Sequence, residues 1–313
     1  MKVLMLSGSG WLGSYITKEL LAHGHEVTIL SRGERKPGFG IQGVNMVQCN
    51  RADIADLTEK LQKYAQDVVI DVIPGYFGAE NTKAVVEALQ GRIKHYLHCS
   101  STGVYTPLQS VPGRETDRVA PLEENGDAFI RKAASDQVIF DAVQNGFPGT
   151  VIQPTCIMGP GMFPMDNMGG RNPNFVKDLE NGETMILPNG GSMLLQFVHP
   201  ADLARAFRMA AENDASIGRH YIISGQRSLT VKEYVHTMAG LLGCKAKTLA
   251  VPADAILAQN DPNLSVGDFR FFLEHMSFDI TRAREELGYE PSFTLEEMLL
   301  DLIAWTKKKY QEM

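Results

Sequence analysis

The stretch "VLMLSGSGWLGSYITKELLAHGHEVTIL" (residues 3–30) decides the fold expected of this chain. An apolar run leads directly into Gly8-x-Gly10-x-x-Gly13, which opens an amphipathic segment, and a second apolar run follows. Glycines at this spacing let the backbone approach a pyrophosphate, whose charge is held by the N–H groups and the dipole of the helix start. Inside a strand–helix–strand unit, the motif predicts a dinucleotide-binding site. The residues expected to contact the dinucleotide in this turn are Gly8, Ser9, Gly10, Trp11, Leu12 and Gly13.

The end of the second apolar run indicates which dinucleotide binds. A site for NAD usually has Asp or Glu there, bonded to the ribose hydroxyls. This chain has Ser31 and Arg32, with Arg35 and Lys36 close behind. A hydroxyl and a guanidinium bind a 2′-phosphate, which a carboxylate would repel. The sequence therefore favours NADP over NAD; the alternative is that Arg32 is a solvated loop charge.

Strand-like and helix-like segments alternate through the first two-thirds of the chain, which is typical of a parallel sheet covered by helices. Strands are expected at 2–6, 26–30, 45–49, 67–73, 95–101, 149–155 and 220–225, and helices at 12–23, 56–64, 79–89 and 127–145. From about 157 a segment rich in Gly, Pro, Met and Asn predicts a long loop, and the chain after 226 looks helical. Thr294 and Glu297 have the spacing of a capping box for the last helix.

These patterns predict a doubly wound parallel α/β sheet, the Rossmann fold, with a smaller, mostly helical C-terminal substrate lobe. Residues 1–156, with 196–225 returning to them, are expected to form the dinucleotide-binding domain. Residues 157–195 and 226–313 are expected to form the lobe. The lobe should close over the C-terminal edge of the sheet, where ligands bind in open α/β sheets.

Charge and composition restrict the partners of the protein. A net charge of −7 argues against binding to nucleic acid or to an anionic membrane, since both require a basic surface. No apolar run approaches the roughly 20 residues that a membrane span needs, and no signal peptide is recognisable, so a cytoplasmic location is expected. The four cysteines are scattered, which predicts reduced thiols. His95 and His98 are expected to pack in a strand, and no metal site is predicted.

Six further segments occur in a recognisable order along the chain. They are "SGSGWLG" (7–13), "DVVIDVIPGY" (67–76), "HCSSTGVY" (98–105), "PTCIMGPG" (154–161), "LQFVHPADLARAF" (195–207) and "FDITRAREELGYEPSFTLEEMLLDLIAW" (278–305). With these motifs nearly the whole chain resembles the extended or atypical short-chain dehydrogenase/reductase superfamily, specifically the NAD-dependent epimerase/dehydratase family. The resemblance implies a Rossmann fold and chemistry on a small-molecule alcohol.

The resemblance also implies a catalytic set, and this chain lacks one member of it. Such enzymes use a Tyr-x-x-x-Lys pair and a Ser: the Tyr transfers a proton, the Lys binds the nicotinamide ribose, and the Ser holds the substrate oxygen. Ser101 and Lys132 stand at the Ser and Lys positions. Ala128 stands at the Tyr position, and no Tyr lies four residues before any Lys in the sequence.

Three explanations of the missing tyrosine are open. First, another group could supply the proton: the acids Glu115, Asp117, Glu123, Glu124 and Asp127, or the hydroxyls of Tyr76, Tyr105 and Ser100. Tyr105 is taken as the catalytic candidate, although it could simply pack under the fifth strand. Second, the substrate could need no tyrosine, as in eliminations or in atypical members of the group in which another group or a water molecule carries the proton. Third, the protein could bind NADP as a regulator without turnover, or bind RNA, which its net charge disfavours.

The remaining site residues are expected at the ends of the strands. For the coenzyme these are Asn50 and Arg51 beside the adenine, Ile73 and Pro74 along the inner edge, and Ser100, Lys132 and Pro154. For the substrate they are Tyr76, Thr102, Arg171, Asn174 and Arg270. Sugar-nucleotide enzymes of the family often have arginines where this chain has Gln153 and Leu195 or Gln196, which weakens a diphosphate interpretation. The methionines at 158, 162, 165 and 168 could form an adaptable apolar wall or fill gaps.

The sequence thus predicts an NAD(P)-dependent oxidoreductase of the epimerase/dehydratase type. Its substrate is expected to be a sugar, a sugar nucleotide or a similar alcohol, oxidised through a keto intermediate. The alternative is a catalytically silent NADP-binding regulator or a nucleic-acid-binding relative. A homodimer formed through the helices at 79–89 and 127–145 is also possible on the pattern of the family.

Overall fold

A parallel sheet forms the centre of the computed structural model, which describes residues 1–34, 37–125 and 127–312; Arg35 and Lys36 lie outside these ranges. Within the described residues, seven strands pair in the order β10-β6-β5-β4-β1-β2-β3, and every pairing is parallel. The strands are β1 (Lys2–Leu6), β2 (Glu26–Ser31), β3 (Asn45–Gln48), β4 (Val68–Asp71), β5 (His95–Cys99), β6 (Gly149–Pro154) and β10 (His220–Ile223). The doubly wound sheet expected from the sequence is confirmed.

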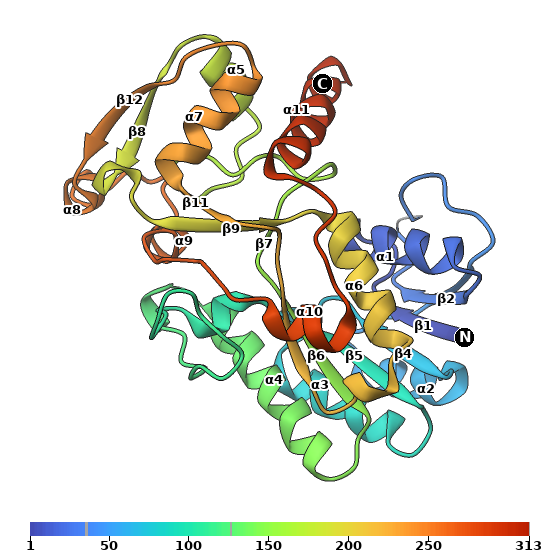
Figure 1. Ribbon diagram of the computed structural model, residues 1–313. Coiled ribbons are helices and arrows are strands. Elements are labelled where there is room, and N and C mark those ends of the chain that lie inside the picture. The colour runs from blue at the N-terminus through green and yellow to red at the C-terminus, as the bar shows by residue number, and fades with distance from the viewer. Residues whose placement is uncertain (35–36, 126, 313) are drawn as a thin grey trace.

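Both faces of the sheet are covered by helices (Figure 1). In β1, Val3 and Met5 belong to one apolar cluster, and Leu4 and Leu6 belong to another, because successive side chains of a strand point to opposite faces. The first cluster packs under α1 (Trp11–Ala22) and α6 (Pro200–Ala211). The second packs under α2 (Ile54–Tyr64), α3 (Pro74–Leu89) and α4 (Asp127–Gln144).

The order of the strands locates the ligand crevice. β1 lies between β2 and β4, so the chain winds outward in one direction from β1 to β3 and in the other from β4 to β6 and β10. At such a switch point the loops leave the sheet on opposite sides and open a crevice at the carboxyl ends of the strands. The glycine turn (residues 7–13) follows β1 and therefore lies at this crevice.

A smaller lobe lies beside the carboxyl edge of the sheet (Figure 1). It contains a three-stranded sheet, β11-β9-β7, and a two-stranded parallel sheet, β12-β8. The strands are β7 (Cys156–Ile157), β8 (Thr184–Pro188), β9 (Leu194–Val198), β11 (Ser228–Thr230) and β12 (Lys247–Val251). The helices are α5 (Phe175–Glu180), α7 (Val231–Leu241), α8 (Ala253–Leu257), α9 (Val266–Phe272) and α11 (Leu295–Glu312). Helix α10 (Thr281–Leu287) packs instead beside β10 and α6 of the main sheet.

The loop expected from about residue 157 is confirmed: residues 158–174 contain no named helix or strand, and α5 and β8 follow them. The expected domain limits fit less well. Of the segment expected to return to the dinucleotide domain, α6 and β10 do so, whereas β9 pairs with β7 and β11 outside the main sheet. The domain limits therefore stay a prediction, while the division into a sheet and a lobe describes the molecule.

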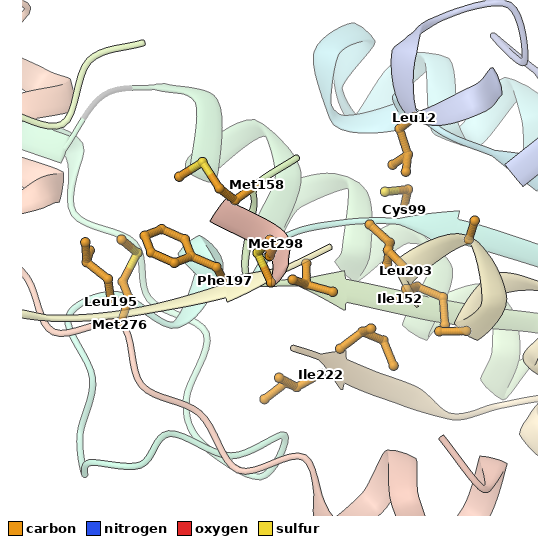
Figure 2. Packing of buried hydrophobic residues seen from close by; sticks show 14 of the residues in the cluster. Leu12, Cys99, Ile152, Met158, Leu195, Phe197, Leu203, Ile222, Met276 and Met298 are labelled. Atoms are coloured by element: carbon orange, nitrogen blue, oxygen red, sulfur yellow. The ribbon is translucent and has the colours of Figure 1, made fainter. Parts of the chain in front are cut away.

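One apolar core joins the sheet to the lobe. Figure 2 shows Ile152 and Ile222 of the main sheet and Leu203 of α6. Phe197 of β9 and Met158, which follows β7, belong to the same apolar cluster. The short 3₁₀ turns around this core are η1 (Thr102–Tyr105), η2 (Glu123–Asn125), η3 (Asn189–Gly191) and η4 (Asp214–Ser216). A shared core makes the lobe a fixed wall of the crevice, because its buried side chains pack directly on those of the sheet. Among the described helices, none has the length and apolar character required to cross a bilayer.

Candidate functional site

A cavity of about 1060 Å³ lies at the carboxyl ends of the parallel strands. Its lining comes from the turns after β1, β2, β3, β4, β5 and β6, from α4, and from the lobe. Pockets for one drug-sized ligand span roughly 300–1,000 Å³. The cavity therefore has the volume for an extended ligand together with a second, smaller one.

The glycine turn forms one wall of the cavity. Gly8 and Gly13 are required by packing: a Cβ on Gly8 would lie 2.8 Å from Cβ of Met5, and one on Gly13 would lie 2.5 Å from the carbonyl oxygen of Ser7. Ser7 occupies the position of the family's first glycine, and it adopts a φ of 66°. Of the six residues expected in this turn, five line the cavity: Ser9, Gly10, Trp11, Leu12 and Gly13.

The start of α1 is open to an anion. Gly10 is the N-cap residue and has no side chain to bond the first N–H groups of the helix. Those N–H groups, with the positive end of the helix dipole, suit a pyrophosphate. The predicted dinucleotide therefore fits this wall on the geometry of the turn as well as on its sequence.

A hydrogen-bonded latch connects this turn to the lobe. The indole N–H of Trp11 donates to the carbonyl of Pro160 at 2.6 Å, and the hydroxyl of Tyr15 donates to the same carbonyl at 3.0 Å. Gly161 has a φ of 106°, and a Cβ there would overlap the indole. The loop after β7 thus lies directly over the first turns of α1.

Ser31, Arg32 and Asn50, which the sequence predicted as coenzyme contacts, line the cavity after β2 and β3. The side chain of Arg32 is 68% exposed, and its guanidinium pairs with Glu34 at 3.1 Å. Glu34, which the sequence argument left out, also lines the cavity. A carboxylate next to Arg32 offsets its positive charge, and it offers an acceptor of the kind that NAD sites use for ribose hydroxyls.

Arg51 lines the cavity, but its guanidinium is held by the protein. It forms a bidentate ion pair with Asp71, in which Nη2 of Arg51 donates to Oδ2 of Asp71 at 2.6 Å. Its Nε donates to the side-chain oxygen of Asn81 at 2.8 Å. Asp71 also accepts from the hydroxyl of Tyr96 at 3.0 Å. The ring of Phe77 lies 5.0 Å from the guanidinium carbon. Arg51 is thus a structural residue beneath the cavity, a role that the sequence argument did not anticipate.

Ser101 and Lys132 are brought to one end of the cavity, with Ser100, Thr102 and Pro154. Ser101 follows β5, and its Oγ accepts from the N–H of Gly103 at 3.2 Å. The stem of Lys132 packs on the backbone of α3, since a Cβ on Gly75 would overlap its Cγ. The hydroxyl of Ser100 donates to buried Asp136 at 2.6 Å. Ile73 also lines the cavity, and Pro74 begins α3.

The position of the missing tyrosine is not part of the described cavity lining. Ala128 is exposed in the first turn of α4, and the neighbouring Phe129 lines the cavity instead. The Phe129 ring lies against Gly103 and stacks on Phe271 of α9, with ring centroids 4.2 Å apart and an interplanar angle of 24°. An aromatic ring without a hydroxyl therefore lies against Gly103, two residues after Ser101.

Tyr105 is not placed to transfer a proton. Its side chain is 2% exposed under β5, outside the cavity lining, and its hydroxyl donates to Gln153 at 2.8 Å. Burial raises the pKa of this phenol. Tyr105 therefore has the packing role that was the alternative to a catalytic one.

Most of the other proton-transfer candidates also lie elsewhere. Among the described residues that line the cavity, none of the five acids preceding Lys132 occurs. Glu115, for example, is buried and accepts from the N–H of Ile222 at 3.0 Å. Burial raises the pKa of the Cys49 thiol to about 11 and that of Cys99 to about 12, and it also raises the pKa of Cys156, so these three cavity thiols stay protonated at neutral pH. The phenol of Tyr76 and the carboxylate of Asp268 do line the cavity.

The substrate candidates divide into two groups. Tyr76, Thr102 and Arg171 line the cavity. Asn174 and Arg270 are exposed outside it, and Arg270 pairs with Glu124 at 3.0 Å. The lining residues that sequence reasoning missed include Phe129, Asp268, Phe271, Phe272 and Met276. Helical spacing could have found three of them, because residues 268, 271 and 272 of α9 share one face.

Comparisons with known proteins agree with this architecture. A model of the "NAD dependent epimerase/dehydratase family" matches residues 3–224. Chloroplast stem-loop binding protein of 41 kDa b of Arabidopsis thaliana is 28% identical over 96% of this chain and 78% of its own length. The 2-alkyl-3-oxoalkanoate reductase of Stenotrophomonas maltophilia is 24% identical over 97% of this chain and 99% of its own.

Solved structures share the fold at lower identity. The dTDP-glucose 4,6-dehydratase of Bacillus anthracis, in complex with NAD, superposes with a TM-score of 0.79 at 18% identity, covering 99% of this chain and 98% of its own. The glycine turn, the parallel sheet and the family match over most of the sequence agree. The chain belongs to the NAD-dependent epimerase/dehydratase family.

Proposed function

We propose that the protein is a nicotinamide-dependent oxidoreductase of the epimerase/dehydratase type. It would oxidise a secondary alcohol of a sugar, a sugar nucleotide or a similar compound to a keto intermediate. The observation that carries the proposal is the single cavity that connects the glycine turn to Ser101 and Lys132. A coenzyme and an alcohol bound there would be in contact, which is the requirement for hydride transfer.

The chain's own residues fit the coenzyme in an extended pose. The uncapped start of α1 at Gly10 suits the pyrophosphate, and the ammonium of Lys132 suits the ribose hydroxyls at the other end. When bound, the coenzyme supplies the hydride acceptor. Ser101 would orient the substrate oxygen with its hydroxyl, because it is the side chain that the family motif assigns to this role.

Tyr76 is the best-supported replacement for the missing proton acceptor. It provides the phenol in the described lining of the cavity, and its side chain is 74% exposed. The preceding residue, Gly75, contacts the stem of Lys132. In the family motif the phenol reaches the lysine from the same helix; here it would reach it from α3. The helix is interrupted just after Tyr76, where Gly78 has a φ of 78°, so the first turn can adjust independently of the rest.

The comparisons support NAD as the coenzyme, since the family is described as NAD-dependent and the related dehydratase was solved with NAD. They give no support to the NADP preference expected from Ser31 and Arg32. The pairing of Arg32 with Glu34 also favours NAD, because the carboxylate of Glu34 offsets the positive charge of Arg32. The preference for NADP therefore stays a prediction, to be measured directly.

Absorbance at the reduced-nicotinamide band tests the proposal. Purified protein is loaded with NAD or NADP and offered a panel of sugars, sugar nucleotides and simple secondary alcohols. Reduction of the coenzyme by one of them supports the oxidoreductase. Tight coenzyme binding with no reduction by any compound would favour a regulator, and absence of coenzyme binding would refute both.

Variants assign the roles of the residues. Lys132→Ala should weaken coenzyme binding by about tenfold or more, the value of a charge-assisted hydrogen bond. Lys83→Ala, an exposed lysine of α3, is the matched control. Tyr76→Phe should keep coenzyme affinity and lower turnover about a hundredfold or more. Unchanged turnover in that variant would remove Tyr76 from the mechanism. Dimerisation through α3 and α4 stays a prediction for sedimentation analysis.

A further inference from the structure

We propose that the substrate has an apolar alkyl or aryl body and no nucleoside diphosphate. This inference rests on the proposed function and narrows its substrate class. It comes from the side of the cavity that the lobe provides. The lobe residues in the lining are Cys156, Ile157, Met162, Met165, Gly169, Arg171, Asp268, Phe271, Phe272 and Met276.

The charges on this side do not suit a diphosphate. Arg171 and Asp268 are its charged residues among those described, and they have opposite signs. The guanidinium of Arg171 already donates to the carbonyls of Ile157 at 2.8 Å and Phe163 at 3.1 Å. In a site with limited water, a diphosphate with its two negative charges needs either free cationic donors or an uncapped helix start, and the uncapped start of α1 is the one that the coenzyme would occupy. Asp268 would instead repel it.

At the two positions where related sugar-nucleotide enzymes often have arginine, this chain has Gln153 and either Leu195 or Gln196, all of them uncharged and buried. Gln153 is fully buried and accepts from the hydroxyl of Tyr105 at 2.8 Å. Gln196 is 4% exposed and accepts from the N–H of Phe278 at 2.7 Å. Both side chains have protein partners. Neither is therefore available to a phosphate oxygen.

Two aromatic rings lie beside the turn that follows Ser101. The Phe129 ring lies against Gly103, two residues after Ser101, and Phe271 stacks on its other side. Behind them, Phe272 packs against Gly169. Aromatic faces contact alkyl and aryl groups well and leave polar groups without partners.

Methionine side chains complete this wall. Met162, Met165 and Met276 line the cavity, and the last two are each 6% exposed. Unbranched thioethers adapt to ligands of different shape. Together with the aromatic rings they predict recognition by contact area, with Asp268 available for a single hydroxyl of the substrate.

A neutral fluorescent probe tests the inference without knowledge of the substrate. N-phenyl-1-naphthylamine is titrated into protein saturated with NAD, so that the coenzyme end is filled, and also into protein without NAD. We expect binding at one site, and we expect Phe271→Ala to weaken it about tenfold. Phe140→Ala is the matched control, because Phe140 is half-buried on α4 and lies outside the cavity lining. Its probe affinity should match the unmodified protein.

Calorimetry with UDP and UDP-glucose is the second arm of the experiment. We expect no binding to the NAD-loaded protein below about 1 mM, since free cationic donors are lacking. Submillimolar binding of either compound would overturn the inference. So would a probe that does not bind, or one that responds equally to Phe271→Ala and Phe140→Ala.

Two controls separate a loss of probe binding from a loss of folding or of coenzyme binding. If Phe271→Ala does not fold, as judged by circular dichroism, Phe271→Leu and Phe129→Leu replace it, with an expected loss of about threefold because a branched alkyl group retains part of the contact. NAD affinity is measured separately for each variant. Failure to bind both NAD and NADP would refute the proposed function, whereas normal coenzyme binding with submillimolar UDP-glucose binding would refute the substrate class alone.

Discussion

Removing the carboxylate of Asp71 tests the structural role of Arg51. Asp71 is fully buried, Arg51 is 6% exposed, and the guanidinium has two bonds to this carboxylate. Asp71→Ala would leave a buried cation without its counter-charge and would also leave the hydroxyl of Tyr96 without its acceptor. Breaking a buried pair in this way costs about 3–5 kcal/mol of unfolding free energy.

The free energy translates into a measurable melting shift. With unfolding entropies near 2.1 cal/mol/K per residue, a chain of 313 residues has about 0.66 kcal/mol/K. A loss of about 3–5 kcal/mol then lowers Tm by about 5–8 °C. Calorimetry of the coenzyme-free protein measures this shift directly.

A matched control and a double variant complete the test. Glu80 pairs with Lys83 at 3.0 Å on α3, with side chains 81% and 53% exposed, so Glu80→Ala should move Tm by less than about 1 °C. Arg51→Met combined with Asp71→Leu removes both charges and should recover most of the loss. A Tm for Asp71→Ala within about 1 °C of that of the unmodified protein would show that Asp71 does not hold the guanidinium. Arg51 would then again be a candidate ligand of the coenzyme.

Three further outcomes follow from single residues. Burial lowers the pKa of His95 to about 4. Since the unfolded chain takes up this proton near pH 6.5, unfolding free energy should fall by about 3 kcal/mol between pH 7 and 4, and less in His95→Gln, as measured by denaturant titration. Arg32→Ala should lower the ratio of NADP to NAD affinity about fivefold in calorimetry, if the guanidinium contacts a 2′-phosphate. Gly161→Ala should cost about 2–4 kcal/mol, because it combines a left-handed backbone with overlap onto Trp11.

Each of these has an outcome that contradicts it. An identical pH dependence in His95→Gln would mean that other groups cause the loss at low pH. An unchanged affinity ratio in Arg32→Ala would establish that this residue is a solvated charge. Gly146 has a φ of 84° and no atom within 4 Å of an added Cβ, so Gly146→Ala measures backbone strain alone. Equal costs for Gly146→Ala and Gly161→Ala would exclude a collision with the indole.

Local patterns in the sequence predicted the elements that depend on local physics. The glycine turn, the strands of the parallel sheet and the capping box at Thr294 follow from residues a few positions apart. The box forms as expected: the N–H of Glu297 donates to the hydroxyl of Thr294 at 3.2 Å, and the N–H of Thr294 donates back to the carboxylate at 2.8 Å. The family motifs likewise brought Ser101 and Lys132 to one cavity.

The misses involve partners that are distant in the chain. β8 pairs with β12, which lies some sixty residues later in the chain. Both strands contain exposed residues, so neither has the continuous apolar run of a buried strand. The ion pair of Arg51 with Asp71 was missed because Asp71 comes 20 residues later, on β4, which β1 and β2 separate from β3 in the sheet. Arg270 was chosen by charge, although the phase of α9 turns Asp268 and Phe271 into the cavity. No pattern within one segment could have revealed the strand pairing or the ion pair, whereas helical spacing could have placed Asp268 and Phe271 on one face of α9.

The latch between Trp11 and Pro160 has a consequence for how the protein handles its coenzyme. The same first turn that would hold the pyrophosphate is tied to the loop above it by two donors on one carbonyl. A dinucleotide bound beneath that loop would leave only after the hydrogen bonds of Trp11 and Tyr15 to the carbonyl of Pro160 have both broken. We therefore expect the coenzyme to remain through many cycles as a resident group, reoxidised in place, and the emission of Trp11 to follow its rare exchanges.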